Sequence, residues 1–303
     1  MSDNTEFRKE LEERTKQINE QIESYLPEEK GHQKTIFEAM NYSVKAGGKR
    51  LRPLFMQEIC RLFTGEVQPV VVPFMAAIEM IHTSSLVHDD LPCMDDDMMR
   101  RGQASTWAEY GEDMGVLAGD ALMIYAFEVA AKAFKEVSDA DDLKRVGRAI
   151  EILASKTGIY GMIGGQVVDV ASCGVGLDEG MLNFIYELKT GALIESSMMI
   201  GALLAGAEDA ELEKVQKIAS DVGIAFQIQD DILDVTSTTE ELGKPVHSDE
   251  KNEKTTYVTL KGLEKATRDV EVISQEALEL LSGLDRENAY LTQLIRELIH
   301  RKK

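Results

Sequence analysis

The sequence has few cysteines and few prolines. Three cysteines occur among 303 residues, and no two of them form a CxxC pair. This argues against a disulfide framework and against a cysteine-based zinc site. Only six prolines interrupt the chain. Ala, Leu, Met, Glu and Lys dominate instead, and these residues favour helices. The composition therefore predicts an all-α protein.

Basic residues are also fewer than acidic residues. The chain has 33 Lys and Arg against 54 Asp and Glu, which gives a formal net charge of -21. A strongly acidic chain lacks the basic surface that nucleic acids require, so we expect no nucleic-acid partner. Anionic lipid headgroups would repel the same surface. The acidic bias instead favours cationic partners, including metal ions.

Long uninterrupted hydrophobic runs are missing. The richest apolar stretches, Val70–Ile81 and Gly115–Ala131, both contain acidic residues. Neither reaches the roughly 18–20 apolar residues that span a bilayer. The first residues show no apolar segment typical of a signal peptide. We therefore expect a cytoplasmic protein without stable membrane insertion.

The pattern along the chain predicts one large helical domain over 1–303. Apolar windows rich in small residues cover Gly115–Phe134, Gly158–Val170 and Thr190–Ala207. Helices that are apolar most of the way round are buried, which predicts central helices surrounded by others. Thr255–Leu260 is the one window with a strand-like pattern, but it leads directly into a helical pattern. There is no linker and no internal repeat that would indicate several domains.

Two clusters of aspartates are the strongest functional signal. Residues 89–97 carry five carboxylates, beginning with Asp89 and Asp90. Pro92 breaks the helix there and allows the chain to direct Asp95 back toward Asp89. In the second cluster, Asp230 and Asp234 fall on one face of a helix, one turn apart, with Asp231 beside them.

Each cluster alone could be a solvated acidic helix end. Both, however, directly follow apolar segments, Ile78–Val87 and Val222–Ile228, and solvated faces rarely adjoin such buried stretches. Two carboxylate sets facing each other would form an all-oxygen site that suits Mg²⁺ better than zinc. Mg²⁺ commonly completes its shell with substrate phosphates. The spacing is not that of an EF-hand.

Basic residues stand beside glycines near these clusters. The segment 47–53 reads GGKRLRP, and RRG follows the first cluster at 100–102. A glycine loop before a helix lets backbone N–H groups approach an anion, although this is not a P-loop. Taken singly, each cation could be a solvated charge, and His82 could be a core histidine. Together they suggest sites for two separate polyphosphates.

These motifs closely resemble those of the trans (E-type) polyprenyl diphosphate synthases, the farnesyl and geranylgeranyl diphosphate synthase family. GGKRLRP, DDLPCMD with RRG, GGQVVD, KTG, FQIQDDILD and a following GK occur in the family's order. Each motif is weak alone, and together they are highly specific. The resemblance implies an all-α bundle of the isoprenoid synthase type with a deep central cavity, usually a homodimer. It also implies prenyltransferase activity in which an allylic diphosphate condenses with isopentenyl diphosphate.

The resemblance also implies roles for individual residues. Three Mg²⁺ ions would be bound chiefly through Asp89, Asp95 and Asp230, with Asp90, Asp231 and Asp234 in support. Isopentenyl diphosphate would bind to Lys49, Arg52, His82 and Arg101. The allylic diphosphate (dimethylallyl, geranyl or farnesyl) would bind to Arg100, Lys189, Thr190, Gln227 and Lys244. Dipoles from Gln166 and Thr190 would support the carbocation.

Product length depends on the floor of the tail pocket. In this family the growing tail runs back along the helix that carries the first aspartate cluster. The residues four and five positions before Asp89 are Ser85 and Ser84. One helical turn is about 5.4 Å, close to the length of one isoprene unit, so a small residue there leaves room for a C20 product. Met75, Ile81 or a side chain from a neighbouring helix could still close the floor at C15.

Two other classes share some of these features. A terpene cyclase has the same fold and one aspartate-rich motif, but it would not need GGKRLRP and RRG for a second diphosphate. A non-catalytic subunit of a heteromeric prenyl synthase would be expected to lose carboxylates, and this chain keeps both sets. Both remain alternatives at this point.

Overall fold

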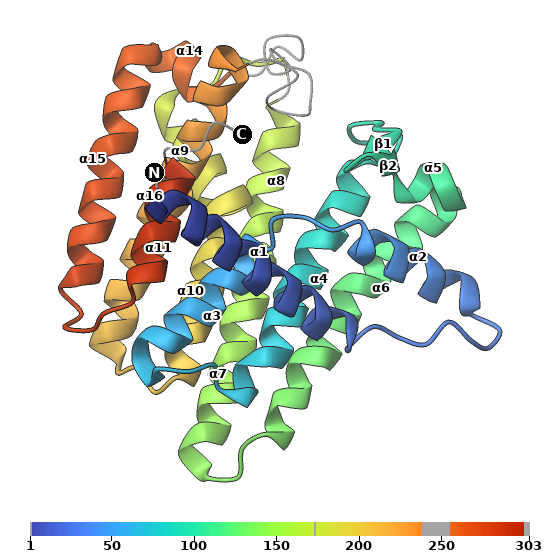
Figure 1. The fold of residues 1–303 in the computed structure, drawn as a ribbon. Coiled ribbons are helices and arrows are strands. Elements are labelled where there is room, and N and C mark those ends of the chain that lie inside the picture. The colour runs from blue at the N-terminus through green and yellow to red at the C-terminus, as the bar shows by residue number, and fades with distance from the viewer. Residues whose placement is uncertain (1, 173, 238–254, 300–303) are drawn as a thin grey trace. The chain divides into compact units, whose positions relative to one another are not determined.

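Helices form nearly all the regular structure in the computed structural model, which describes residues 2–172, 174–237 and 255–299. Within these residues the strands are a single antiparallel hairpin, in which β1 (Met99–Arg100) pairs with β2 (Gln103–Ala104). The prediction of an all-α protein is confirmed (Figure 1).

The chain packs into two compact units. The first contains residues 1–60 and 64–150, and the second contains residues 61–63 and 151–303. Each has its own buried apolar core, represented by Phe55 and Phe74 in the first unit and by Leu193 and Ile200 in the second. The expectation of a single domain over 1–303 stays a prediction.

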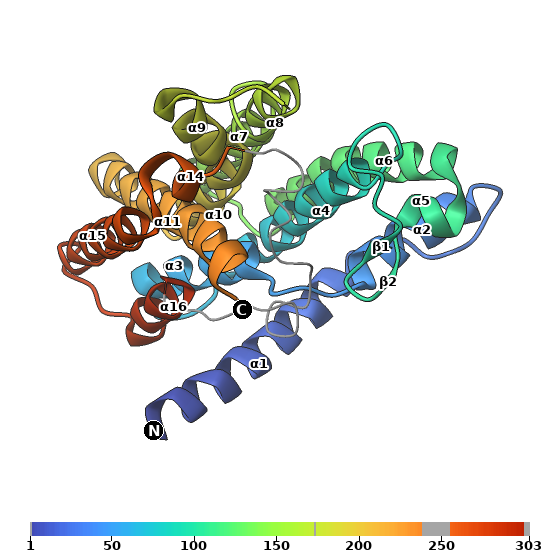
Figure 2. The same cartoon turned by 90° about the horizontal axis from the view of Figure 1, so that it is seen from above.

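The first unit carries the first aspartate cluster. Helix α4 lies along helix α6 in both views (Figures 1 and 2), and α4 ends where the cluster begins. The elements of this unit are α1 (Ser2–Glu23), α2 (Lys34–Lys45), most of α3 (Leu51–Thr64), the short 3₁₀ helix η1 (Pro69–Val71), α4 (Val72–Asp89), the hairpin, α5 (Thr106–Tyr110), α6 (Glu112–Ala131), η2 (Lys132–Lys135) and the first part of α7 (Ala140–Thr157).

Helix α6 is not the fully buried helix that its composition predicted. Leu117 and Ile124 are 50% and 72% exposed. The stretches Pro69–Asp89 and Glu112–Lys135 are each long and apolar enough to cross a membrane by length and composition alone, contrary to the sequence-based expectation. The first is 78% buried within the protein, whereas the second is 39% buried. Core helices of soluble proteins pass the same test, so α4 needs no membrane to cover it.

The second unit carries the second aspartate cluster on α11, which packs against α10 and α15 (Figure 1). All residues of α10 are buried, as its small and apolar sequence predicted. The elements are the end of α7, α8 (Met162–Ala171), α9 (Glu179–Ile185), the π-helical segment η3 (Tyr186–Gly191), α10 (Ala192–Leu204), α11 (Asp209–Thr236), α14 (Tyr257–Lys261), α15 (Leu263–Ser282) and α16 (Ala289–Ile299).

Most of the window Thr255–Leu260, whose residues are strand-like, forms helix α14. Thr256 is the N-cap residue, and its hydroxyl accepts a hydrogen bond from the backbone N–H of Thr259. The Thr259 hydroxyl accepts in turn from the Thr256 N–H, at 2.8 Å. This reciprocal capping box stabilises a helix start despite the β-branched residues around it.

Candidate active site

The first aspartate cluster turns back on itself at the end of α4. The helix stops at Asp89, and the backbone N–H of Asp95 donates to the carbonyl oxygen of Asp89 at 2.8 Å. Asp96, at a φ of 53°, lies in the left-handed region that this tight return requires. Asp95 is exposed and Asp89 is half-buried. The break at Pro92 therefore has the effect that the sequence predicted.

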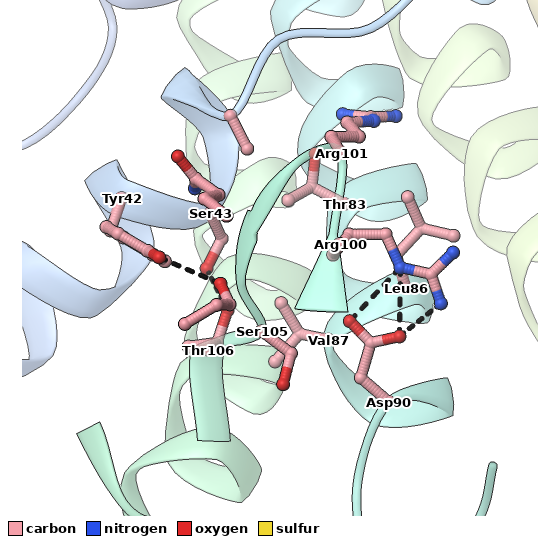
Figure 3. Close-up of a pocket in the computed structure, with 13 residues that line it drawn as sticks. Tyr42, Ser43, Thr83, Leu86, Val87, Asp90, Arg100, Arg101, Ser105 and Thr106 are labelled. Carbon is pink, nitrogen blue, oxygen red and sulfur yellow. Dashed lines mark hydrogen bonds and ion pairs between the residues drawn. The ribbon is translucent and has the colours of Figure 1, made fainter. Parts of the chain in front are cut away.

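Asp90 is buried against the hairpin by an ion pair with Arg100. The Nε of Arg100 lies 2.9 Å from Oδ1 and 3.2 Å from Oδ2 of Asp90. A second carboxylate, that of Asp97, lies 3.2 Å from the Arg100 guanidinium. Burial raises the pKa of the Asp90 carboxyl, and Arg100 opposes this shift. Figure 3 shows Arg100 directed at Asp90 while Arg101 points elsewhere. The contacts of Asp90 are thus with Arg100, which indicates a positioning function.

Arg101 lies directly against the glycine loop. Its guanidinium donates to the carbonyl oxygen of Gly47. A Cβ atom at Gly48 would come 2.7 Å from the Arg101 Cζ atom, and the φ of Gly48 is 134°. The backbone conformation therefore favours glycine, and an added Cβ would in addition displace the Arg101 guanidinium. The loop and the hairpin together form one part of a cluster of the basic residues Arg52, His82 and Arg101, which we call the cation cluster.

His82 and Arg52 complete this cluster, and the exposed Lys49 stands beside it in the loop. Burial and the neighbouring arginines, Arg52 first, lower the pKa of His82 well below its usual value. Burial likewise lowers the pKa of Arg52 and of Arg101. His82 is therefore neutral at neutral pH, and it can offer hydrogen bonds but no charge.

The second aspartate cluster lies on α11. Asp230 is half-buried, while Asp231 and Asp234 are buried. Oδ2 of Asp231 accepts a hydrogen bond from the backbone N–H of Tyr257 at 2.7 Å and another from the hydroxyl of Tyr186. Asp231 thus ties α14 and η3 to α11, a function that the sequence pattern did not indicate.

The KTG motif occupies the π-helical segment η3. Nζ of Lys189 lies 2.6 Å from Oδ2 of Asp169 on α8. The hydroxyl of Thr190 lies 2.9 Å from Oε1 of Gln227 on α11. Single-turn π-helical segments occur frequently at functional sites. The structure therefore brings together three residues assigned to the allylic site, and it adds Asp169, which the sequence analysis did not select although it belongs to the GGQVVD motif.

The remaining predicted residues lie on α4, on α8 and outside the described part of the chain. Ser84 is fully buried on α4. Ser85 is half-buried, and its hydroxyl donates to the carbonyl oxygen of His82 at 2.8 Å. Gln166 lies half-buried on α8. Lys244 lies outside the residues that the structure describes.

The carboxylates supply hard oxygen donors, which fits Mg²⁺. Within the described ranges, no three or more His, Cys, Asp or Glu side chains are close enough to hold a metal ion by themselves. Mg²⁺ is usually bound by one or two carboxylates together with water and substrate phosphates.

A helical chain with two aspartate clusters, with arginines near the first and Lys189 on the segment that contacts the second, is the arrangement of an isoprenoid synthase. The model of the polyprenyl synthetase family matches residues 33–295. The chain therefore belongs to the polyprenyl synthetase family, and it is a short-chain prenyl diphosphate synthase, a prenyltransferase.

Three known proteins illustrate the similarity. The chloroplastic geranylgeranyl pyrophosphate synthase of Catharanthus roseus is 46% identical over 84% of this chain and 70% of its own length. The apo structure of an FPP/GFPP synthase from Zymomonas mobilis matches with a TM-score of 0.84 and 31% identity, covering 97% and 99% of the two chains. A geranyltransferase from Helicobacter pylori, complexed with magnesium and isoprenyl diphosphate, matches with a TM-score of 0.80 and 32% identity, covering 95% and 96%.

Proposed function

We propose that this chain condenses an allylic diphosphate with isopentenyl diphosphate and releases geranylgeranyl diphosphate as its main product. The observation that carries the assignment is that each unit holds its own basic group near an aspartate cluster. Arg52 and Arg101 lie around the neutral His82 in the first unit, and Arg101 is close enough to Asp90 to feel its charge. In the second unit, Lys189 lies on η3, which contacts Asp231 through Tyr186. Two diphosphate substrates require basic groups at two such places.

The cation cluster is assigned to isopentenyl diphosphate, together with Lys49. The allylic diphosphate is assigned to Lys189, Thr190 and Gln227, with Arg100 and Lys244. Asp89, Asp95 and Asp230 are the ligands proposed for three Mg²⁺ ions. The magnesium and isoprenyl diphosphate bound to the Helicobacter pylori relative support this assignment.

The residues lower the barrier by stabilising charge on the leaving diphosphate. Bound Mg²⁺ would supply Lewis-acid stabilisation of that charge. Lys189 is held in place by its ion pair with Asp169, so its ammonium group is oriented before the substrate arrives. The allylic C–O bond breaks to leave a carbocation, the double bond of isopentenyl diphosphate attacks it, and a proton is lost to the departing diphosphate. The hydroxyl of Thr190, which is hydrogen-bonded to Gln227, and the amide of Gln166 would support the cation by their dipoles.

Two observations support the proposal of a C20 product: the small residue Ser84 on α4, and the similarity to the geranylgeranyl pyrophosphate synthase of Catharanthus roseus. Ser84→Tyr is expected to shift the main product from C20 toward C15, because a ring at this buried position shortens the tail pocket by about one helical turn. Products are resolved by chain length after incubation with labelled isopentenyl diphosphate. Ser84→Ala, which stays small, should keep the wild-type profile. An unchanged profile for Ser84→Tyr would place the pocket floor at another residue, such as Met75 or Ile81.

A homodimer is the proposed assembly, and the outer face of α6 is its proposed contact. Leu117 and Ile124 lie seven residues apart on one face of this helix and are both exposed. Light scattering should give twice the chain mass of 33.7 kDa. Ile124→Glu should give the monomer mass. Ile159→Glu, at a residue that is 71% exposed outside α6, should leave the dimer intact. A monomeric wild-type protein would contradict the proposal.

A further inference from the structure

A buried carboxylate, Glu79, lies inside the cation cluster of the first unit. It sits on α4, one turn before His82, so both side chains share a helix face. Glu79 is 1% exposed. A buried carboxylate is strongly destabilising unless cations and hydrogen bonds compensate for it, so its place among arginines calls for an explanation.

One oxygen of Glu79 is used to anchor Arg50. Oε1 accepts from the Arg50 guanidinium at 2.7 Å. The same guanidinium donates to Oδ1 of Asn19 at 2.7 Å and to the carbonyl oxygen of Val44 at 2.6 Å. Arg50 is buried and its φ is 49°. It therefore ties the glycine loop to α1, α2 and α4, and its guanidinium is committed to protein acceptors.

The other oxygen of Glu79, Oε2, is buried and has no hydrogen-bond partner among the residues that the structure describes. The Nε–H donor of Arg52 is also buried and likewise has no partner among those residues. Glu79 stabilises the charged form of Arg52 and also that of Arg101. A buried polar group without a hydrogen-bond partner destabilises the folded protein. One hydrogen bond from Arg52 Nε to Glu79 Oε2, direct or through a water molecule, would satisfy both atoms.

We propose that Glu79 is a positioning residue for the isopentenyl diphosphate site, in which Oε1 fixes the loop through Arg50 and Oε2 orients Arg52. This inference rests on the assignment of Arg52 and Arg101 to that substrate. Glu79 neutralises part of the charge that would otherwise drive the guanidinium groups apart, so the cations remain converged when no diphosphate is bound.

A positioning function and a simple charge effect predict opposite results for Glu79→Gln. Glutamine keeps the size of the side chain and an acceptor for Arg50, but it loses the charge. If Glu79 were only a nearby negative charge, its removal would relieve repulsion and tighten binding of the anionic substrate. If Glu79 holds Arg52 in place, the same change weakens binding because the cation cluster disperses.

The experiment compares steady-state kinetics of Glu79→Gln with those of wild type. We expect the KM for isopentenyl diphosphate to rise about tenfold, which is the effect of ~1.4 kcal/mol expected for one charge-assisted hydrogen bond. The kcat and the KM for the allylic substrate should stay within about twofold, because a positioning effect confined to one site leaves the other unchanged. Calorimetric titration of Mg²⁺-free protein with isopentenyl diphosphate should show the same weakening.

Glu58→Gln is the matched control. Glu58 is another fully buried carboxylate of the first unit, and it is paired with Arg14. Its substitution should lower thermal stability but leave the KM for isopentenyl diphosphate unchanged. If Glu79→Gln does not fold, Glu79→Asp keeps the charge on a shorter side chain and should still raise this KM. Unchanged or tighter binding in the folded Glu79 variant would overturn the inference.

Arg52→Gln separates this inference from the substrate assignment on which it rests. An increased KM for isopentenyl diphosphate in Arg52→Gln, with an unchanged KM in Glu79→Gln, would contradict the positioning function of Glu79 alone. An unchanged KM in Arg52→Gln would contradict the assignment of the cluster itself.

Discussion

Substituting Asp89 or Asp230 by asparagine is expected to lower the rate of condensation about a thousandfold, the scale of losing a principal electrostatic stabiliser of the transition state. Asparagine keeps the shape of the side chain but lacks the charge that binds Mg²⁺. The protein should stay folded, because Asp89 is half-buried at a helix end and Asp230 is half-buried on α11. Single-turnover rates and circular dichroism of each variant provide the measurement.

Asp96→Asn is the control for this pair. Asp96 belongs to the same cluster, is exposed, and has a φ of 53°, which asparagine also tolerates. Its turnover should remain close to wild type. Near-wild-type turnover in both Asp89→Asn and Asp230→Asn would refute the assignment of the two clusters to Mg²⁺.

Gly165→Ala is expected to destabilise the second unit by ~3 kcal/mol and to lower turnover more than tenfold, because overpacking against backbone cannot be relieved by a side-chain rotation. An added Cβ would come 2.3 Å from the backbone nitrogen of Lys189 and 2.8 Å from its Cα atom. Helix α8 and η3 would have to separate. The ion pair between Asp169 and Lys189 joins these same two elements, so Lys189 would lose its orientation.

Gly147→Ala on α7 provides the comparison. A Cβ atom there has open space around it. Alanine in a helix interior should stabilise the protein by up to about 1 kcal/mol, since glycine is the poorer helix former. Thermal unfolding measures both variants. A Gly165→Ala protein as stable and active as wild type would contradict the close approach of α8 and η3.

The sequence correctly predicted those structural features that depend on a single local rule. Pro92 predicted the end of α4 and the return of Asp95, because proline cannot continue a helix. The small and apolar residues of Thr190–Ala207 predicted the buried helix α10. The resemblance to the polyprenyl diphosphate synthases likewise implied that Thr190 and Gln227 share one site, and the two side chains are hydrogen-bonded.

The sequence did not predict contacts between residues that are distant from each other in the chain. Glu79 looked like an interruption of an apolar run, whereas it is the partner of Arg50, 29 residues away. Asp231 looked like a metal ligand, and its contacts with Tyr186 and Tyr257 depend on how η3 and α14 pack. Helix α6 looked buried because composition does not report which face packs. Such contacts follow from tertiary packing, which residue patterns do not encode locally.

A product assay tests the proposed activity most directly. Purified protein is incubated with Mg²⁺ and labelled isopentenyl diphosphate, together with dimethylallyl, geranyl or farnesyl diphosphate in separate reactions, and the products are resolved by chain length. We expect elongation from each primer and a C20 end product. A C15 end product would contradict geranylgeranyl diphosphate as the main product. The absence of elongation from every primer would contradict the condensation itself.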